Sequence, residues 1–163
     1  MEQAEYIKKF TGKTDDREIL ITRVVNAPRD LVYKTYTEPE HVVHWWGPDG
    51  FTIEIQEMDV RVGGCWRYIM TGRDMVFPNF ISYLEVVKPE RLVYLHGSNE
   101  GEEPEFMATI TFEAQGDKTK ITMHSVFGNA ATRNFVVTEF HVIEGGNQAL
   151  DKFEQYLKSQ QVK

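Results

Sequence analysis

Residues 136–157 read VVTEFHVIEGGNQALDKFEQYL, and the spacing of apolar residues in this stretch decides the fold. Residues that would share one face of a helix recur at steps of three and four: Val136, Phe140, Ile143, Gly146, Leu150, Phe153 and Leu157. Charged residues such as Glu144, Asp151 and Glu154 occupy the opposite side. This spacing predicts one long amphipathic helix whose apolar face is buried.

The stretch before this helix has a period of two, which is typical of strands. Alternating or β-branched runs occupy residues 17–25, 51–56, 65–71, 76–87, 91–96, 106–113 and 119–125. The later runs are joined by short connections, so neighbouring strands are expected to be antiparallel. After the first run, Pro28 and Pro39 each suit the first turn of a helix, which predicts two short helices there.

An antiparallel sheet buries one face, and the long helix is the element best able to cover it. Because a strongly twisted sheet curls, the prediction is an α+β architecture: a curved six- to seven-stranded antiparallel sheet wrapped around the C-terminal helix. Such a helix leaves space toward the rims of the sheet, and an apolar cavity is expected there. Residues 17–160 form this one domain, and the polar residues 1–16 form a loose arm or a short docked helix, with the arm favoured.

Three segments carry a resemblance to a known family: APRDLVYKTYTEPEHVVHWWGP (27–48), DVRVGGCWRYIM (59–70) and KPERLVY (88–94). Together they resemble the activator of heat shock protein 90 ATPase homologue-like family of the START-like, or SRPBCC, superfamily of helix-grip proteins. The similarity covers roughly residues 17–158. It implies the fold deduced above, a deep pocket, and relatives that are mostly small bacterial proteins without an assigned ligand.

The chain departs from the family pattern at Gly145 and Gly146, where the family usually has Gly-Trp. An indole on the inward line of the helix would bury about 150–250 Å². Its absence at Gly146 is therefore expected to enlarge the cavity, unless neighbours such as Phe140 or Trp66 fill the space.

Composition excludes several classes of function. The formal charge of -7 and the lack of a basic stripe argue against nucleic-acid binding. The single cysteine, Cys65, fits a reducing compartment, and no run is apolar enough to suggest membrane insertion, so a cytoplasmic protein is expected. His41 and His44 lie three residues apart without a third ligand at helical spacing, so neither a metal nor another cofactor is expected.

The expected cavity lining combines aromatic, methionine and aliphatic residues with one polar anchor, His96. At least one of Trp45 and Trp46 is placed near its mouth, because the two residues lie at the end of the pair of short helices. The full set of candidate ligand-binding residues is Trp45, Trp46, Trp66, Tyr68, Met70, Phe80, His96, Met107, Ile110, Met123, Phe140, Ile143, Gly146 and Leu150. No residue is assigned a catalytic role.

Three functions remain open from the sequence. The first is binding of a small hydrophobic ligand, such as a lipid, a polyketide or an aromatic metabolite, by a monomer or homodimer. The second is a cyclase or hydrolase that uses a pocket histidine or acid. The third is a co-chaperone that contacts heat shock protein 90, which the name of the family suggests.

Overall fold

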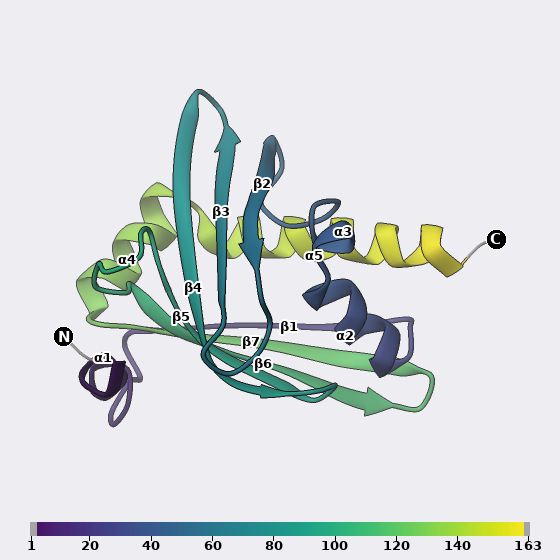
Figure 1. The fold of residues 1–163 in the computed structure, drawn as a ribbon, viewed down its shortest axis with the longest axis horizontal. Coiled ribbons are helices and arrows are strands. Elements are labelled where there is room, and N and C mark those ends of the chain that lie inside the picture. The colour runs from purple at the N-terminus through teal and green to yellow at the C-terminus, as the bar shows by residue number, and fades with distance from the viewer. Residues whose placement is uncertain (1–2, 162–163) are drawn as a thin grey trace.

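The computed structural model describes residues 3–161, which form five helices and seven strands (Figure 1). In chain order these are α1 (Gln3–Lys9), β1 (Glu18–Val25), α2 (Arg29–Thr37), α3 (Pro39–Val42), β2 (Phe51–Met58), β3 (Cys65–Gly72), β4 (Met75–Val87), β5 (Arg91–Gly97), β6 (Phe106–Gln115), β7 (Lys118–Phe127), α4 (Ala130–Glu139) and α5 (Val142–Gln161).

The strands form one antiparallel sheet in the order β1-β7-β6-β5-β4-β3-β2. Figure 1 shows β2, β3 and β4 rising steeply away from the direction of β1, β6 and β7, so the sheet is strongly bent. The register shifts at Ile55/Glu57 and at Tyr83/Glu85, and irregularities of this kind increase local twist. The predicted curved antiparallel sheet is confirmed.

Helix α5 lies on the concave side of this sheet and supplies Leu150, Phe153 and Leu157 to the main core. Arg23 of β1 fixes the helix from the edge, since its guanidinium pairs with Asp151 at 2.8 Å and Glu154 at 2.9 Å. The two short helices α2 and α3 follow β1, as predicted, and Pro39 occupies the first turn of α3. The helix-grip architecture is therefore the one that the sequence indicates.

The C-terminal helix differs from its prediction, because it is two helices. Phe140 caps α4 by donating its backbone N–H to the carbonyl of Val136, and His141 follows with a φ of 51°. This left-handed conformation ends α4 and lets α5 start in a new direction. Phe140 therefore belongs to the end of α4 and not to the inward line of α5.

The N-terminal segment takes the docked alternative. Helix α1 is followed by Phe10, which is buried on the convex side of the sheet with Leu95 and Val126. Arg17 then donates to the carbonyl of Phe127 at 2.7 Å and closes this segment onto β7. The convex face thus carries a small second core.

None of the helices in the described residues 3–161 is both long and apolar enough to cross a bilayer.

Candidate functional site

An aromatic cluster fills the concave side of the sheet beneath α2 and α3; we define it as Tyr36, Trp45, Trp46, Trp66 and Tyr68. Tyr36 comes from α2, the two adjacent tryptophans come from the segment after α3, and the other two residues come from β3. Alternation along β3 sends Trp66 and Tyr68 to the same face, where both are buried. Three separate segments therefore converge on one place.

Trp45 is a core residue of this cluster. Its indole packs edge-on against Phe153 of α5 with ring centroids 4.6 Å apart. Its Nε1–H donates to the carbonyl of Thr35 at 3.1 Å, so the polar end of the side chain is satisfied. Trp45 thus ties the short helices to α5.

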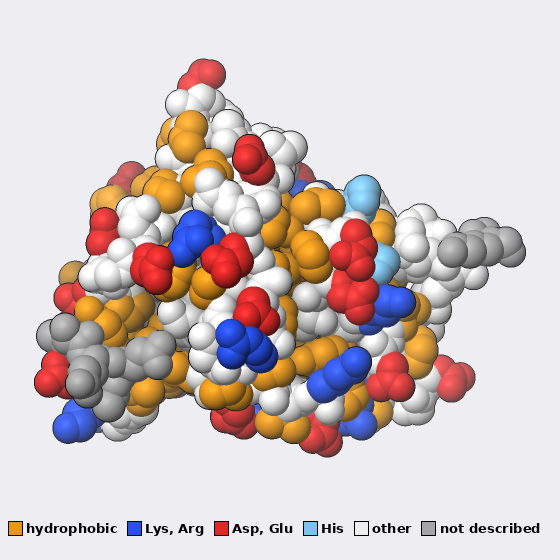
Figure 2. Space-filling model, viewed as in Figure 1, with side chains coloured by type: hydrophobic (Ala, Val, Ile, Leu, Met, Phe, Trp, Pro, Cys, Tyr) orange, Lys and Arg blue, Asp and Glu red, His pale blue; other side chains and the backbone are white. Residues whose placement is uncertain are grey.

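Trp46 is only half-buried and lies at the centre of the cluster. Its ring centroid is 6.0 Å from Tyr36, 5.3 Å from Trp45 and 4.7 Å from Trp66, each in an edge-to-face arrangement. Its Nε1–H donates to the hydroxyl of Tyr68 at 2.9 Å. Figure 2 shows hydrophobic side chains reaching the surface in the region between β2 and α3.

Two buried polar atoms of the cluster have no hydrogen-bond partner in the described part of the chain: the hydroxyl of Tyr36 and Nε1 of Trp66. The two side chains are 3% and 2% exposed. An unpaired buried donor costs about 1–3 kcal/mol, and native structures contain few of them.

The phenols here remain protonated at ordinary pH. Burial raises the pKa of Tyr36 and Tyr68 above the usual value, and the nearby phenols of Tyr83 and Tyr94 add to the effect at Tyr36. Tyr83 and Tyr94 also have raised pKa values, mainly through burial. Each hydroxyl therefore keeps a proton that it can donate.

His96 lies on the same concave face, with its ring beside that of Tyr68, and is buried on β5. Its Nε2 lies 2.8 Å from Oδ1 of Asn79, whose own amide nitrogen donates to the carbonyl of Phe77 at 3.0 Å. Because Oδ1 can only accept, Nε2 carries the proton and Nδ1 is left with its lone pair. Burial lowers the pKa of His96 to about 4, so the ring is neutral.

The space expected beside Gly146 is filled. A Cβ at Gly146 would lie 2.7 Å from Cδ1 of Ile21, which comes from β1. At Gly145 a Cβ would lie 3.1 Å from Cβ of Pro48. The glycine pair therefore lets α5 approach the sheet on one side and the Pro48 loop on the other, and the expected enlargement of the cavity at Gly146 is wrong.

Two of the predicted lining residues point to the other side of the sheet. Phe80 lies on the convex face, where the guanidinium of Arg67 sits 5.4 Å from the centre of its ring. Met107 packs with Phe10, Leu95 and Val126 in the small convex core. Neither residue meets the aromatic cluster.

The remaining predicted residues line the concave side at different depths. Ile110 and Leu150 are fully buried, and Met70, Met123 and Ile143 are half-buried against the main core. Phe140 is exposed at the end of α4, with its ring 5.9 Å from that of Phe77. Sequence reasoning missed Tyr36, Tyr83 and Tyr94; their inward positions follow from the helical spacing of Val32 and Tyr36 and from the alternation of the β4 and β5 residues.

Two hollows in the surface lie away from the cluster. One, of ≈ 730 Å³, lies by the C-terminal half of α5 and is lined by residues including Pro28, Asp117 and Lys158. The other, of ≈ 390 Å³, lies on the convex face beside Tyr6, Phe80 and Leu95. Neither hollow is lined by a residue of the aromatic cluster.

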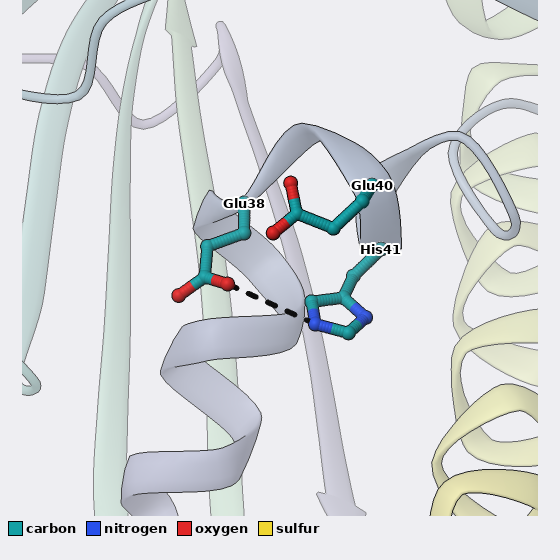
Figure 3. Close-up of side chains that lie close together, drawn as sticks. All are labelled: Glu38, Glu40 and His41. Carbon is teal, nitrogen blue, oxygen red and sulfur yellow. Dashed lines mark ion pairs between the residues drawn. The ribbon is translucent and has the colours of Figure 1, made fainter.

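A polar group at the N-terminal end of α3 brings together Glu38, Glu40 and His41, whose potential ligand atoms all lie within 4.8 Å of one another (Figure 3). Nε2 of His41 lies 3.8 Å from a carboxylate oxygen of Glu38, and Nδ1 lies 2.7 Å from the hydroxyl of Tyr156. The two nitrogens of the ring thus face the Tyr156 hydroxyl and the Glu38 carboxylate.

Comparison with known proteins agrees with this architecture. Residues 26–158 match the family model described as activator of Hsp90 ATPase homolog 1-like protein. The chain belongs to this family. Its fold is the START-like, or SRPBCC, helix-grip fold, which is commonly a ligand-binding fold.

Several solved structures share the fold. Protein Ms6760 from Mycobacterium smegmatis is 24% identical with a TM-score of 0.82, over 92% of this chain and 96% of that one. A protein from Arthrobacter aurescens is 21% identical with a TM-score of 0.81, over 91% and 90%. Protein NE0264 from Nitrosomonas europaea is 23% identical with a TM-score of 0.79, over 93% and 100%. The search of curated proteins gives no match to this chain.

Proposed function

We propose that this family member binds a small, mainly hydrophobic molecule at the aromatic cluster on the concave face of its sheet. The observation that carries the proposal is the pair of buried donors, the Tyr36 hydroxyl and the Trp66 indole N–H, that lack partners in the described chain. Ligand sites typically combine an apolar lining with a few convergent polar groups.

The surroundings of these donors favour an apolar occupant. Trp66 packs against Trp46 and Tyr68 with centroid distances of 4.7 and 4.5 Å, and Tyr36 packs against Phe112 at 5.3 Å. A molecule bound here would bury its carbon surface against rings and give the two donors a partner. Both effects favour the bound state.

Titration with phenylnaphthylamine, an apolar dye that fluoresces in dry surroundings, tests the proposal. We expect a saturable increase in dye emission with one site per chain and a rise in the unfolding temperature. The matched control is Phe80→Leu on the convex face, which should bind the dye as the wild type does. The proposal is wrong if the folded wild-type protein shows neither a saturable increase in dye emission nor a rise in unfolding temperature.

The hydrogen bond between His96 and Asn79 favours a second candidate, a cyclase or hydrolase that uses this histidine. Its Nδ1 lone pair is available as a proton acceptor. The pKa of about 4, however, makes the imidazole a weak base near neutrality. Binding is therefore the function that this geometry supports better, and contact with the heat-shock chaperone stays a prediction.

A further inference from the structure

The chemistry of the aromatic cluster points to a class of ligand, and this inference rests on the proposed binding function. Trp46 is the decisive residue, because its half-buried indole has rings of Tyr36, Trp45 and Trp66 around it in edge-to-face contact. Its one polar atom donates to Tyr68. A flat bicyclic ring with a polar edge thus already occupies the centre of the site.

The segment that carries this ring belongs to neither a helix nor a strand. Trp46 follows α3 and is succeeded by Gly47 with a φ of 96°, a conformation that favours glycine. Trp45, its neighbour, is 1% exposed and anchored to Thr35, so the backbone before Trp46 is held. The Trp46 side chain is therefore the member of the cluster best placed to leave while the others stay.

The walls that would remain are rich in hydrogen-bond donors. The Trp66 indole can only donate, the Tyr36 hydroxyl has no partner in the described chain, and Tyr68 loses its bond from Trp46 when that ring moves. Burial keeps the phenols in their protonated form, because it raises their pKa values. A ligand that satisfies these groups must bring an acceptor.

We infer that the cluster takes a planar aromatic molecule bearing an oxygen acceptor, a carbonyl or a comparable group, and that this molecule takes the place of the Trp46 indole. The ring of the ligand then packs against the rings that Trp46 leaves. Its oxygen accepts from Trp66 and Tyr36.

Two compounds of indole size that differ in one oxygen test the inference. Indanone carries a ring carbonyl, and indane has the same fused carbon skeleton without it. We expect the wild-type protein to bind indanone about tenfold more tightly than indane, because one or two buried donors gain a partner. Equal affinities for the two compounds would overturn the inference and would fit donors that are satisfied by water alone.

Substitutions test which residues cause the preference for indanone over indane. Tyr36→Phe removes an unpaired hydroxyl and keeps the ring, so it should fold as the wild type does. Combined with Trp66→Phe, it should bring the two affinities together without weakening indane. Trp46→Ala should tighten both compounds several-fold with the preference retained, because the competing ring is gone. The control Phe80→Leu should change neither compound.

A readout on the unaltered chain does not depend on any variant folding. Bound indanone should move the indole N–H resonance of Trp66 downfield, and indane should not. A Trp46 indole resonance that stays unchanged at saturation would contradict its displacement. If phenylnaphthylamine fails to bind, the proposed function itself fails; if the dye binds and the two small compounds bind without the carbonyl preference, only the ligand class is wrong.

Discussion

Burial of His96 links the charge of one side chain to the stability of the fold. The imidazole is buried with its pKa lowered from 6.5 to about 4, and desolvation of the charged form is the cause. The unfolded chain therefore binds a proton in a range of pH where the native protein does not. Stability is full above the unfolded pKa and falls as pH drops toward the folded one.

We predict that the wild type loses about 3 kcal/mol of unfolding free energy through this group between about pH 7 and pH 4. Urea denaturation at a series of pH values measures the loss. The matched variant His96→Gln lacks the titrating ring, so its stability should fall less steeply over the same range. Parallel curves for the two proteins would show that His96 is not held neutral.

The contact between α5 and β1 depends on the missing side chain at Gly146. Ile21 occupies the position that a Cβ would need, with its Cδ1 2.7 Å away. The methyl group at the end of a flexible side chain can move for an alanine. A larger side chain would have to displace the whole of Ile21.

We predict that Gly146→Leu destabilises the protein by about 1–3 kcal/mol through overpacking. Adding Ile21→Ala should return part of that loss, so the double variant should be more stable than the sum of the single changes allows. Thermal or urea unfolding of all four proteins gives the coupling energy. If the effects of Gly146→Leu and Ile21→Ala on stability simply add, the two residues are not in contact.

For the helices and strands, the sequence predicts most elements. It fails where the spacing of apolar residues fits more than one arrangement. The period of three and four located the apolar side of α5, but His141 adopts its left-handed conformation without being glycine, so the break before α5 left no signal. β4 carries apolar residues on both faces, which hid the outward direction of Phe80. Met107 had a signal, because it alternates with Phe106 and Ala108 and must face the opposite side.

For the molecule as a whole, the sheet separates two cores with different roles. The concave core holds α5 and the aromatic cluster, and the smaller convex core holds Phe10 of the N-terminal segment. The sequence favoured a loose arm over a docked helix for this segment, whereas the structure has α1 and a buried Phe10 there. Its anchor, Phe10, meets residues 85 and more positions away in the chain, such as Leu95.

We predict that Phe10→Ala lowers the unfolding free energy by about 3–5 kcal/mol, because it empties a buried position in the convex core. The affinity for phenylnaphthylamine at the concave cluster should not change, since the sheet lies between the two. Urea unfolding and dye titration of the same preparation check both statements. A parallel loss of dye affinity in the folded variant would mean that the two faces are coupled.

The crowding of Trp45, Trp46 and Trp66 has an optical consequence. These are all three tryptophans of the chain, and the successive centroid distances are 5.3 and 4.7 Å. Excitation absorbed by one indole can pass to the next over such separations, so we expect the spectra of the three to be coupled. The tryptophan contribution to the native near-ultraviolet spectrum therefore comes from this one cluster. A ligand that binds there changes the spectrum, so binding can be followed without an attached label.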